Sequence, residues 1–168
     1  MKRKALLLMM GILPALALGA VSSEDESFYK SAAEGGLAEV AAGKLAEDKA
    51  GSAQVKDFGG MMVKDHSTAN AKLWKIAGDA GVKLPATPGV EQVAASERLN
   101  LLSGPSFDKA YIKDQIEAHR DTVALFKKEI ASGHDATARQ FATQTLPTVQ
   151  SHLEKIMQIA GAAGISAD

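Results

Sequence analysis

The sequence predicts an all-α fold in which four long helices pack together as a bundle. Small and apolar side chains recur in alternating steps of three and four residues over four long segments, which is the spacing of one buried helix face. Glycine and proline gather between these segments and mark the turns. Valine, isoleucine and threonine never form the strict alternation with polar residues that is typical of a half-buried strand, so no strand is expected.

The chain begins with a segment of a different kind. Residues 1–4 are basic after the initial methionine, and residues 5–20 are apolar and end in small side chains. This pattern is typical of a secretory signal peptide, and Gly11 and Pro14 make the apolar part too short and broken for a confident membrane span. We expect cleavage near Ala20 and export to the periplasm or beyond, with an uncleaved anchor as the alternative.

The remainder, residues 21–168, is long enough for one domain with its own core. Removal of the three basic leader residues changes the formal net charge from −1 to −4. A mildly acidic domain without a basic stripe argues against nucleic acid as a partner. No second long apolar segment is present, so no integral membrane domain is expected after cleavage, and no feature identifies a protein partner. The chain contains no cysteine and therefore no disulfide.

The first two helices form a hairpin with a tight turn. Asp25 or Ser27 can cap the first helix, which continues to about Ala50. Gly51 and Ser52 interrupt the pattern, and the second helix covers about residues 53–80. The predicted turn is short, so the two helices must lie antiparallel.

The third and fourth helices form a second hairpin after a connection of about 26 residues, which holds a short helix over about residues 90–102. Ser106 can cap the third helix, which ends near Gly133, and Asp135 can cap the fourth, which contains Pro147 and should kink there. A long connection between helices 2 and 3 lets them run parallel, as in bundles with one crossover. A simple up-down bundle is the alternative.

The candidate site consists of one ligand-competent residue on the predicted inner face of each long helix. These residues are Glu39, His66, His119 and His152. At a rise of about 1.5 Å per residue, all four lie near the middle of the bundle, so their side chains can meet at one level. Asp65, beside His66, points about 100° around the helix and is expected to be solvated.

Imidazole and carboxylate groups together suit one transition-metal ion: zinc, iron, manganese or copper. Because a histidine must be neutral to bind a metal, affinity should fall below about pH 6. The alternative is a metal-free envelope protein whose buried polar groups satisfy one another through hydrogen bonds. A hydrolytic enzyme using histidine and glutamate as acid and base lacks any pocket motif.

Four stretches of the sequence resemble one exported bacterial family. They are residues 38–46 (AEVAAGKLA), 62–66 (MVKDH), 107–111 (FDKAY, followed by His119) and 146–153 (LPTVQSHL). The family is the domain of unknown function 4142 (DUF4142), placed among the ferritin-like bundles, and the likeness covers about residues 27–160. The resemblance implies a ferritin-like four-helix bundle, whereas the biochemical role of the family is not established.

The sequence departs from the di-iron pattern of ferritin-like proteins, which use Glu-x-x-His motifs on two helices. The residues three before the candidate histidines are Val63, Ile116 and Val149. A carboxylate-rich di-iron centre is therefore not expected. The interpretation favoured by the residues is a centre for one metal ion, with three imidazoles and one carboxylate, serving metal handling or a redox or stress-protective role.

Overall fold

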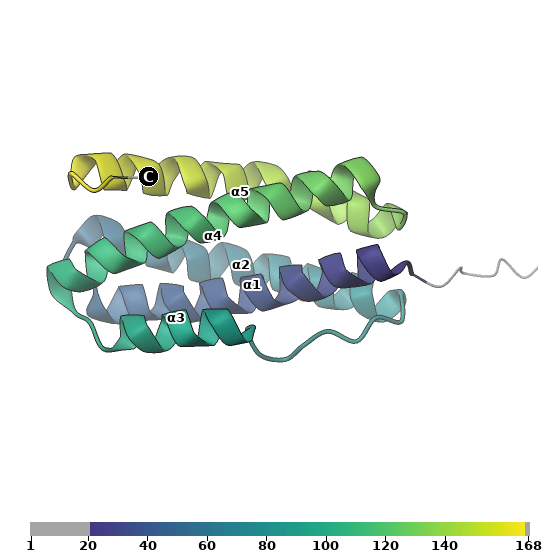
Figure 1. The fold of residues 1–168 in the computed structure, drawn as a ribbon, viewed down its shortest axis with the longest axis horizontal. Coiled ribbons are helices and arrows are strands. Elements are labelled where there is room, and N and C mark those ends of the chain that lie inside the picture. The colour runs from purple at the N-terminus through teal and green to yellow at the C-terminus, as the bar shows by residue number, and fades with distance from the viewer. Residues whose placement is uncertain (1–20, 167–168) are drawn as a thin grey trace, which may run out of the picture.

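The computed structural model describes residues 21–166, so the predicted signal peptide lies outside the described residues. The described residues fold into helices joined by turns and one long connection (Figure 1). The helices are α1 (Ser23–Lys49), α2 (Ala53–Asp79), α3 (Val90–Asn100), α4 (Gly104–Ser132) and α5 (Ala136–Ala162). The predicted helix ranges are confirmed to within a few residues, and α5 continues as a helix on both sides of Pro147.

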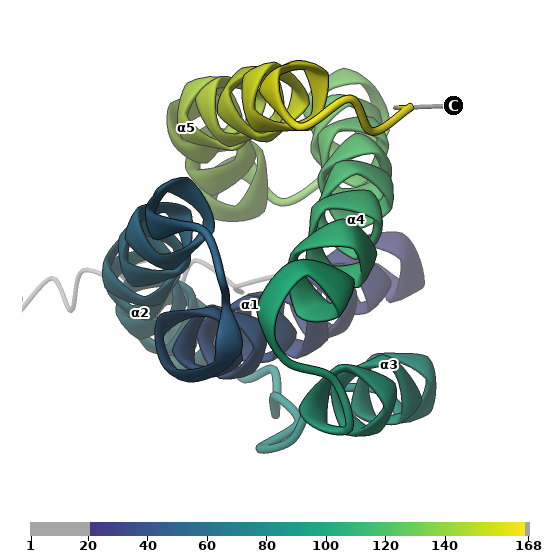
Figure 2. The same cartoon turned by 90° about the vertical axis from the view of Figure 1, so that its left-hand side faces the viewer.

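Helices α1, α2, α4 and α5 form a four-helix bundle, which Figure 2 shows nearly end-on. The connection after α2 returns along the outside of the bundle and includes α3, which packs against α1 and α4. Because of this return, α2 and α4 run in the same direction (Figure 1). The predicted long crossover is therefore confirmed, and the up-down alternative is wrong. None of the helices within residues 21–166 has both the length and the hydrophobicity to cross a bilayer.

Two of the predicted helix caps are wrong. The cap of α1 is Ser22, whose hydroxyl accepts a hydrogen bond from the Asp25 backbone N–H at 3.1 Å. The cap residue of α4 is Ser103, not Ser106, because Pro105 occupies the first turn, where a missing N–H costs nothing. The predicted cap of α5 is confirmed, since the Asp135 side chain accepts from the backbone of Ala138.

Asp25 has a different role, which it shares with Asp108. The buried Asp25 carboxylate accepts hydrogen bonds from the backbone N–H groups of His134 and Asp135, at 2.8 and 3.1 Å. Asp108, near the start of α4, accepts in the same way from the backbone of residues 51 and 52, at 3.0 and 2.9 Å. Each tight turn is thus tied to the first helix of the other hairpin. These two ties help to fix the register of the hairpins and therefore the levels at which the candidate site residues lie.

The core has an apolar cluster toward each end of the bundle. The cluster near the α1–α2 turn includes Phe58, Met62 and Ile156, and the cluster near the α4–α5 turn includes Leu73 and Phe126. The buried residues Glu39, His119 and His152 belong to neither cluster. The chain therefore places a polar layer in the middle of an otherwise apolar bundle.

Helices α1 and α2 approach each other closely beside this layer. A Cβ atom on Gly43 would lie 2.7 Å from the backbone oxygen of Gly59, and a Cβ atom on Gly59 would lie 2.7 Å from the backbone oxygen of Gly43. Both distances are shorter than any normal contact, so only glycine fits at these positions. Gly43 lies one turn after Glu39, so this contact helps to set the position of the carboxylate against α2.

Candidate metal centre

Three of the four predicted site residues come together in the bundle. One ring nitrogen from each of His66, His119 and His152 lies within 4.8 Å of the other two. The ring centroids are separated by 5.9 Å (His66 to His119), 5.5 Å (His66 to His152) and 5.6 Å (His119 to His152). The rings thus form a nearly equilateral triangle contributed by α2, α4 and α5.

The three rings meet because each helix carries its histidine on the face that packs inward. Met62 and Ile116, one turn from His66 and His119, are both buried in the cluster near the α1–α2 turn. The Phe58 ring packs edge-on against His119 and His152, with centroid distances of 6.3 and 6.4 Å. Apolar packing against these neighbours therefore limits how far the imidazole rings can turn.

Each ring has a buried nitrogen without a hydrogen-bond partner: Nε2 of His66, Nε2 of His119 and Nδ1 of His152. His66 is only partly buried as a whole residue, yet this Nε2 atom is inaccessible. A buried polar atom without a partner costs about 1–3 kcal/mol, and native proteins keep few of them. Three of them in one place are accounted for if a single electrophile satisfies them all, and a metal ion meets that requirement.

The donor set fits such an ion. Zinc binds imidazole nitrogens at about 2.0–2.1 Å, which places tetrahedral ligand atoms about 3.3 Å apart. The three nitrogens lie within 4.8 Å of one another, so their separations must shorten by up to about 1.5 Å to reach ligand geometry. Small changes in the histidine side-chain torsions must supply this shift.

The second nitrogen of two of the rings is already hydrogen-bonded. Nδ1 of His119 donates to the backbone carbonyl oxygen of Gln115 at 2.9 Å, and Nε2 of His152 donates to the Asp65 carboxylate at 3.0 Å. Because the acceptors are oxygens, the proton must lie on these nitrogens. The lone pairs of His119 Nε2 and His152 Nδ1 are then free, which is the arrangement seen in metal-binding histidines held by outer partners.

Asp65 is not among the mutually close ligand atoms, as expected, but it is not only solvated, because it holds His152 through this hydrogen bond. Its side chain is 33% exposed and lies at the rim where α2 packs against α5. A position 100° from the inward face of a helix points toward the neighbouring helix, not straight out to water. The one signal in the sequence is that Asp65 directly precedes a candidate ligand.

Glu39 lies in the same layer but on the other side of His119. Its Oε2 accepts a hydrogen bond from the Gln115 side-chain amide at 2.7 Å, and its Oε1 lies 3.9 Å from Nδ1 of His119. This nitrogen is opposite the free Nε2. Among the described residues, the group of mutually close ligand atoms consists of the three histidines and does not include Glu39. Gln115, which holds Glu39, was not identified from the sequence.

Burial of the layer disfavours the charged forms of His66, His152 and Glu39. Burial lowers the pKa of His66 to about 3, and the neighbouring His119 and His152 add to this effect. Burial also lowers the pKa of His152, although Asp65 acts in the opposite direction. Burial raises the pKa of Glu39, opposed by His119 and Gln115. Protons therefore compete for the His66 and His152 nitrogens only at lower pH than in a solvated histidine, so the expected loss of metal below pH 6 shifts to more acidic values.

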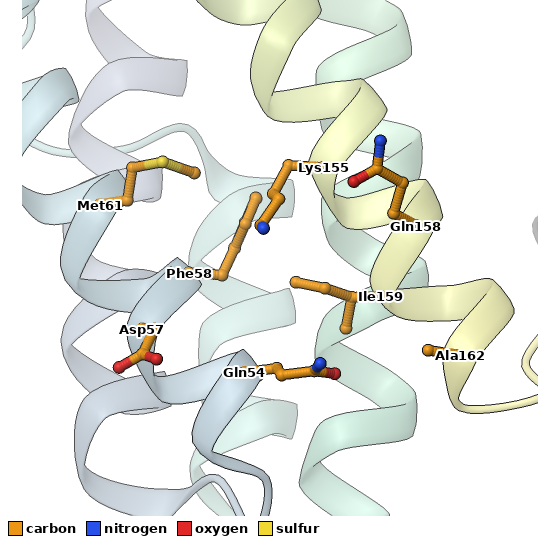
Figure 3. A pocket seen from close by; sticks show the side chains of 8 residues that line it. All are labelled: Gln54, Asp57, Phe58, Met61, Lys155, Gln158, Ile159 and Ala162. Carbon is orange, nitrogen blue, oxygen red and sulfur yellow. The ribbon is translucent and has the colours of Figure 1, made fainter.

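A groove of about 320 Å³ lies on the outer side of Phe58, between α2 and α5. In Figure 3 the Phe58 and Lys155 side chains lie close together in the groove, with Met61 and Ile159 on either side of them. Phe58 also contacts His119 and His152, as described above. One aromatic ring therefore separates the groove from the histidines.

Comparison with known proteins agrees with this fold. No curated protein matches the chain. A DUF305 protein from Streptomyces coelicolor, described as a candidate secreted protein, superposes with a TM-score of 0.73 at 13% identity, over 87% of this chain and 96% of that one. A DUF305 fragment from Deinococcus radiodurans gives 0.74 at 11% identity, over 84% and 98%. At such identities the likeness shows the fold alone.

The sequence itself matches one family model over most of its length. The match covers residues 13–159, which includes all four bundle helices except the last residues of α5. The family has no assigned activity, so the match confirms the predicted membership and adds no chemistry. The chain belongs to the family of the domain of unknown function DUF4142.

Proposed function

We propose that this protein binds one transition-metal ion in its core through His66, His119 and His152, and serves metal handling or redox and stress protection. The observation that carries the proposal is the set of three buried imidazole nitrogens without partners. Three neutral nitrogens suit zinc, iron, manganese or copper. A purely structural polar layer, the alternative, would be expected to pair these nitrogens with one another or with nearby groups.

Glu39 supplies the negative charge in this proposal, because a bound cation favours the ionised carboxylate and opposes the burial that raises its pKa. Its carboxyl group can act from behind His119, where it is now held by Gln115, or can reach the ion as a fourth ligand after its side chain rotates. Four protein ligands would close a tetrahedral site and favour storage or transport of the metal, whereas three leave a position for another molecule. The position of Glu39 beside Nδ1 of His119 supports the arrangement in which Glu39 acts from behind His119 and the three histidines alone are ligands.

The proposal includes export. The basic and apolar pattern of residues 1–20 supports a signal peptide, and the similar Streptomyces coelicolor protein is described as a candidate secreted protein. Residues 21–168 would then be the mature domain. In that location the site would meet metal ions that enter the cell envelope.

The direct test is a titration of metal-free protein with Zn²⁺ in competition with a chromophoric chelator, at pH 7.5 and pH 5. We expect saturation at one ion per chain. Because burial lowers the pKa of His66 and His152, the affinity should fall less between these pH values than it would for three solvated imidazoles, which are mostly protonated at pH 5. No saturable binding at either pH would support the metal-free alternative.

Asp65→Asn should weaken this binding by about 10- to 100-fold, because the amide no longer holds the His152 ring through a charge-assisted hydrogen bond. The same titration measures the effect. Asp121→Asn is the matched control, since Asp121 is exposed on α4 two residues after His119 and should leave the affinity unchanged. Equal affinities for the two variants would show that Asp65 does not orient a ligand.

A further inference from the structure

A small cavity adjoins the histidine layer on the side of the α4–α5 turn. It has a volume of about 40 Å³, and Glu39 and His66 form part of its wall. Each of the four predicted site residues also has a neighbour in the wall, three or four positions away on the same helix. These neighbours are Gly35, Asn70, Thr122 and Val149. All four bundle helices therefore contribute to it, which places the cavity on the bundle axis, one turn away from the histidines.

The opposite side of the layer is filled. Met62 lies four residues before His66, Ile116 three before His119 and Ile156 four after His152, and all three side chains are buried in the apolar cluster near the α1–α2 turn. The Phe58 ring also covers His119 and His152 on that side. The open side of the three-histidine group is therefore the side that faces the cavity.

Three histidine ligands leave at least one coordination position vacant. Of the three, His66 lines this cavity directly, and residues one turn from His119 and His152 complete the wall next to them. We propose that the cavity is a binding chamber for an inorganic molecule of two or three atoms, which coordinates the metal on the cavity side of the histidines. This inference rests on the proposed function, because it needs the ion that the histidines hold.

The size of the cavity restricts the ligand. One water needs about 10–15 Å³ of such volume, so about 40 Å³ holds roughly three waters. Pockets for organic substrates are about 300–1,000 Å³. Most of the wall surface is apolar, from side chains such as Ala69, Leu73 and Phe126, and Glu39 contributes its one carboxyl group beside His66, Asn70 and three hydroxyl side chains. Such a wall suits an uncharged diatomic molecule, or a small anion whose charge the metal balances.

The test uses azide as the probe and bound Co²⁺ as the reporter, because the visible spectrum of Co²⁺ changes with its coordination. The metal-to-protein ratio is measured first. Azide should then change the spectrum of the loaded protein and saturate at one per metal, whereas imidazole at the same concentration should not, because its five-membered ring exceeds the chamber. An equal response to imidazole, or no response to azide at a metal ratio of one, would overturn the inference but not the metal site. A metal ratio of zero would overturn both.

Variants that fill the cavity give a second comparison. Ala69→Leu and Ala32→Leu each add three carbons to the cavity wall from different helices. Either should raise the azide Kd at least tenfold while one Co²⁺ per chain is retained. Ala71→Leu is the matched control, since Ala71 is exposed on α2 and should leave the azide Kd unchanged. Unchanged azide binding in a metal-loaded Ala69→Leu or Ala32→Leu variant would place the azide elsewhere and contradict the proposal.

Discussion

A variant with glutamine in place of His66, His119 and His152 will retain no metal and will gain no stability when Zn²⁺ is added. The wild-type protein will be stabilised, because an ion that binds only the folded state adds about 2.7 kcal/mol at a free concentration of 100 times its Kd. For a domain of this size that corresponds to a rise in Tm of about 9 °C. Thermal unfolding with and without Zn²⁺, followed by circular dichroism, measures the difference.

The fourth histidine of the chain provides the control. His134 lies in the α4–α5 turn, outside the buried layer, and its side chain is 69% exposed. His134→Gln should therefore show the full wild-type response to Zn²⁺. If the triple variant is folded and shows the same rise in Tm as the wild type, the ion binds elsewhere and the proposed ligand set is wrong.

Gly59→Ala should cause a large loss of stability for the addition of a single methyl group. The new Cβ would lie 2.7 Å from both the backbone oxygen of Gly43 and the Cβ of Ala46. Backbone atoms of a long helix cannot move aside locally, so α1 and α2 must separate. Overpacking of this kind costs about 1–3 kcal/mol. Urea unfolding measures the change in the free energy of unfolding.

Gly78→Ala is the matched control on the same helix. A Cβ at Gly78 meets no atom within 4 Å, so this substitution should stabilise the protein by about 0.5–1 kcal/mol through helix propensity alone. The two alanine variants are thus expected to change stability in opposite directions. A similar effect at both sites would mean that α1 and α2 do not approach as closely at Gly59 as the structure shows.

The sequence predicted the bundle well because its strongest signals are local. The inner faces of the helices repeat with a clear period, and Gly51–Ser52 and Gly133 mark tight turns. The length of the connection between α2 and α4 predicted the crossover, because only a long segment can return along the whole bundle. Three candidate histidines followed from the same periodicity, and the structure brings them together.

The parts that could not be predicted depend on contacts between distant segments. Asp25 fits a local capping rule, yet its carboxylate binds the turn at residues 134 and 135, over a hundred residues away. Asp65 on α2 bonds to His152 on α5. This contact depends on the packing angle between the two helices, which the residue pattern of one helix does not specify. Glu39 lies at the predicted level, but the side of His119 that it faces depends on its hydrogen bond to Gln115 on α4.

The most direct measurement of the central claim is an anomalous difference map from a crystal of the protein grown with Zn²⁺, recorded at the zinc absorption edge. One strong peak is expected in the bundle core, about 2.0–2.1 Å from Nε2 of His66, Nε2 of His119 and Nδ1 of His152. A map with no peak between these three nitrogens, or with peaks only on the surface, would contradict the central claim.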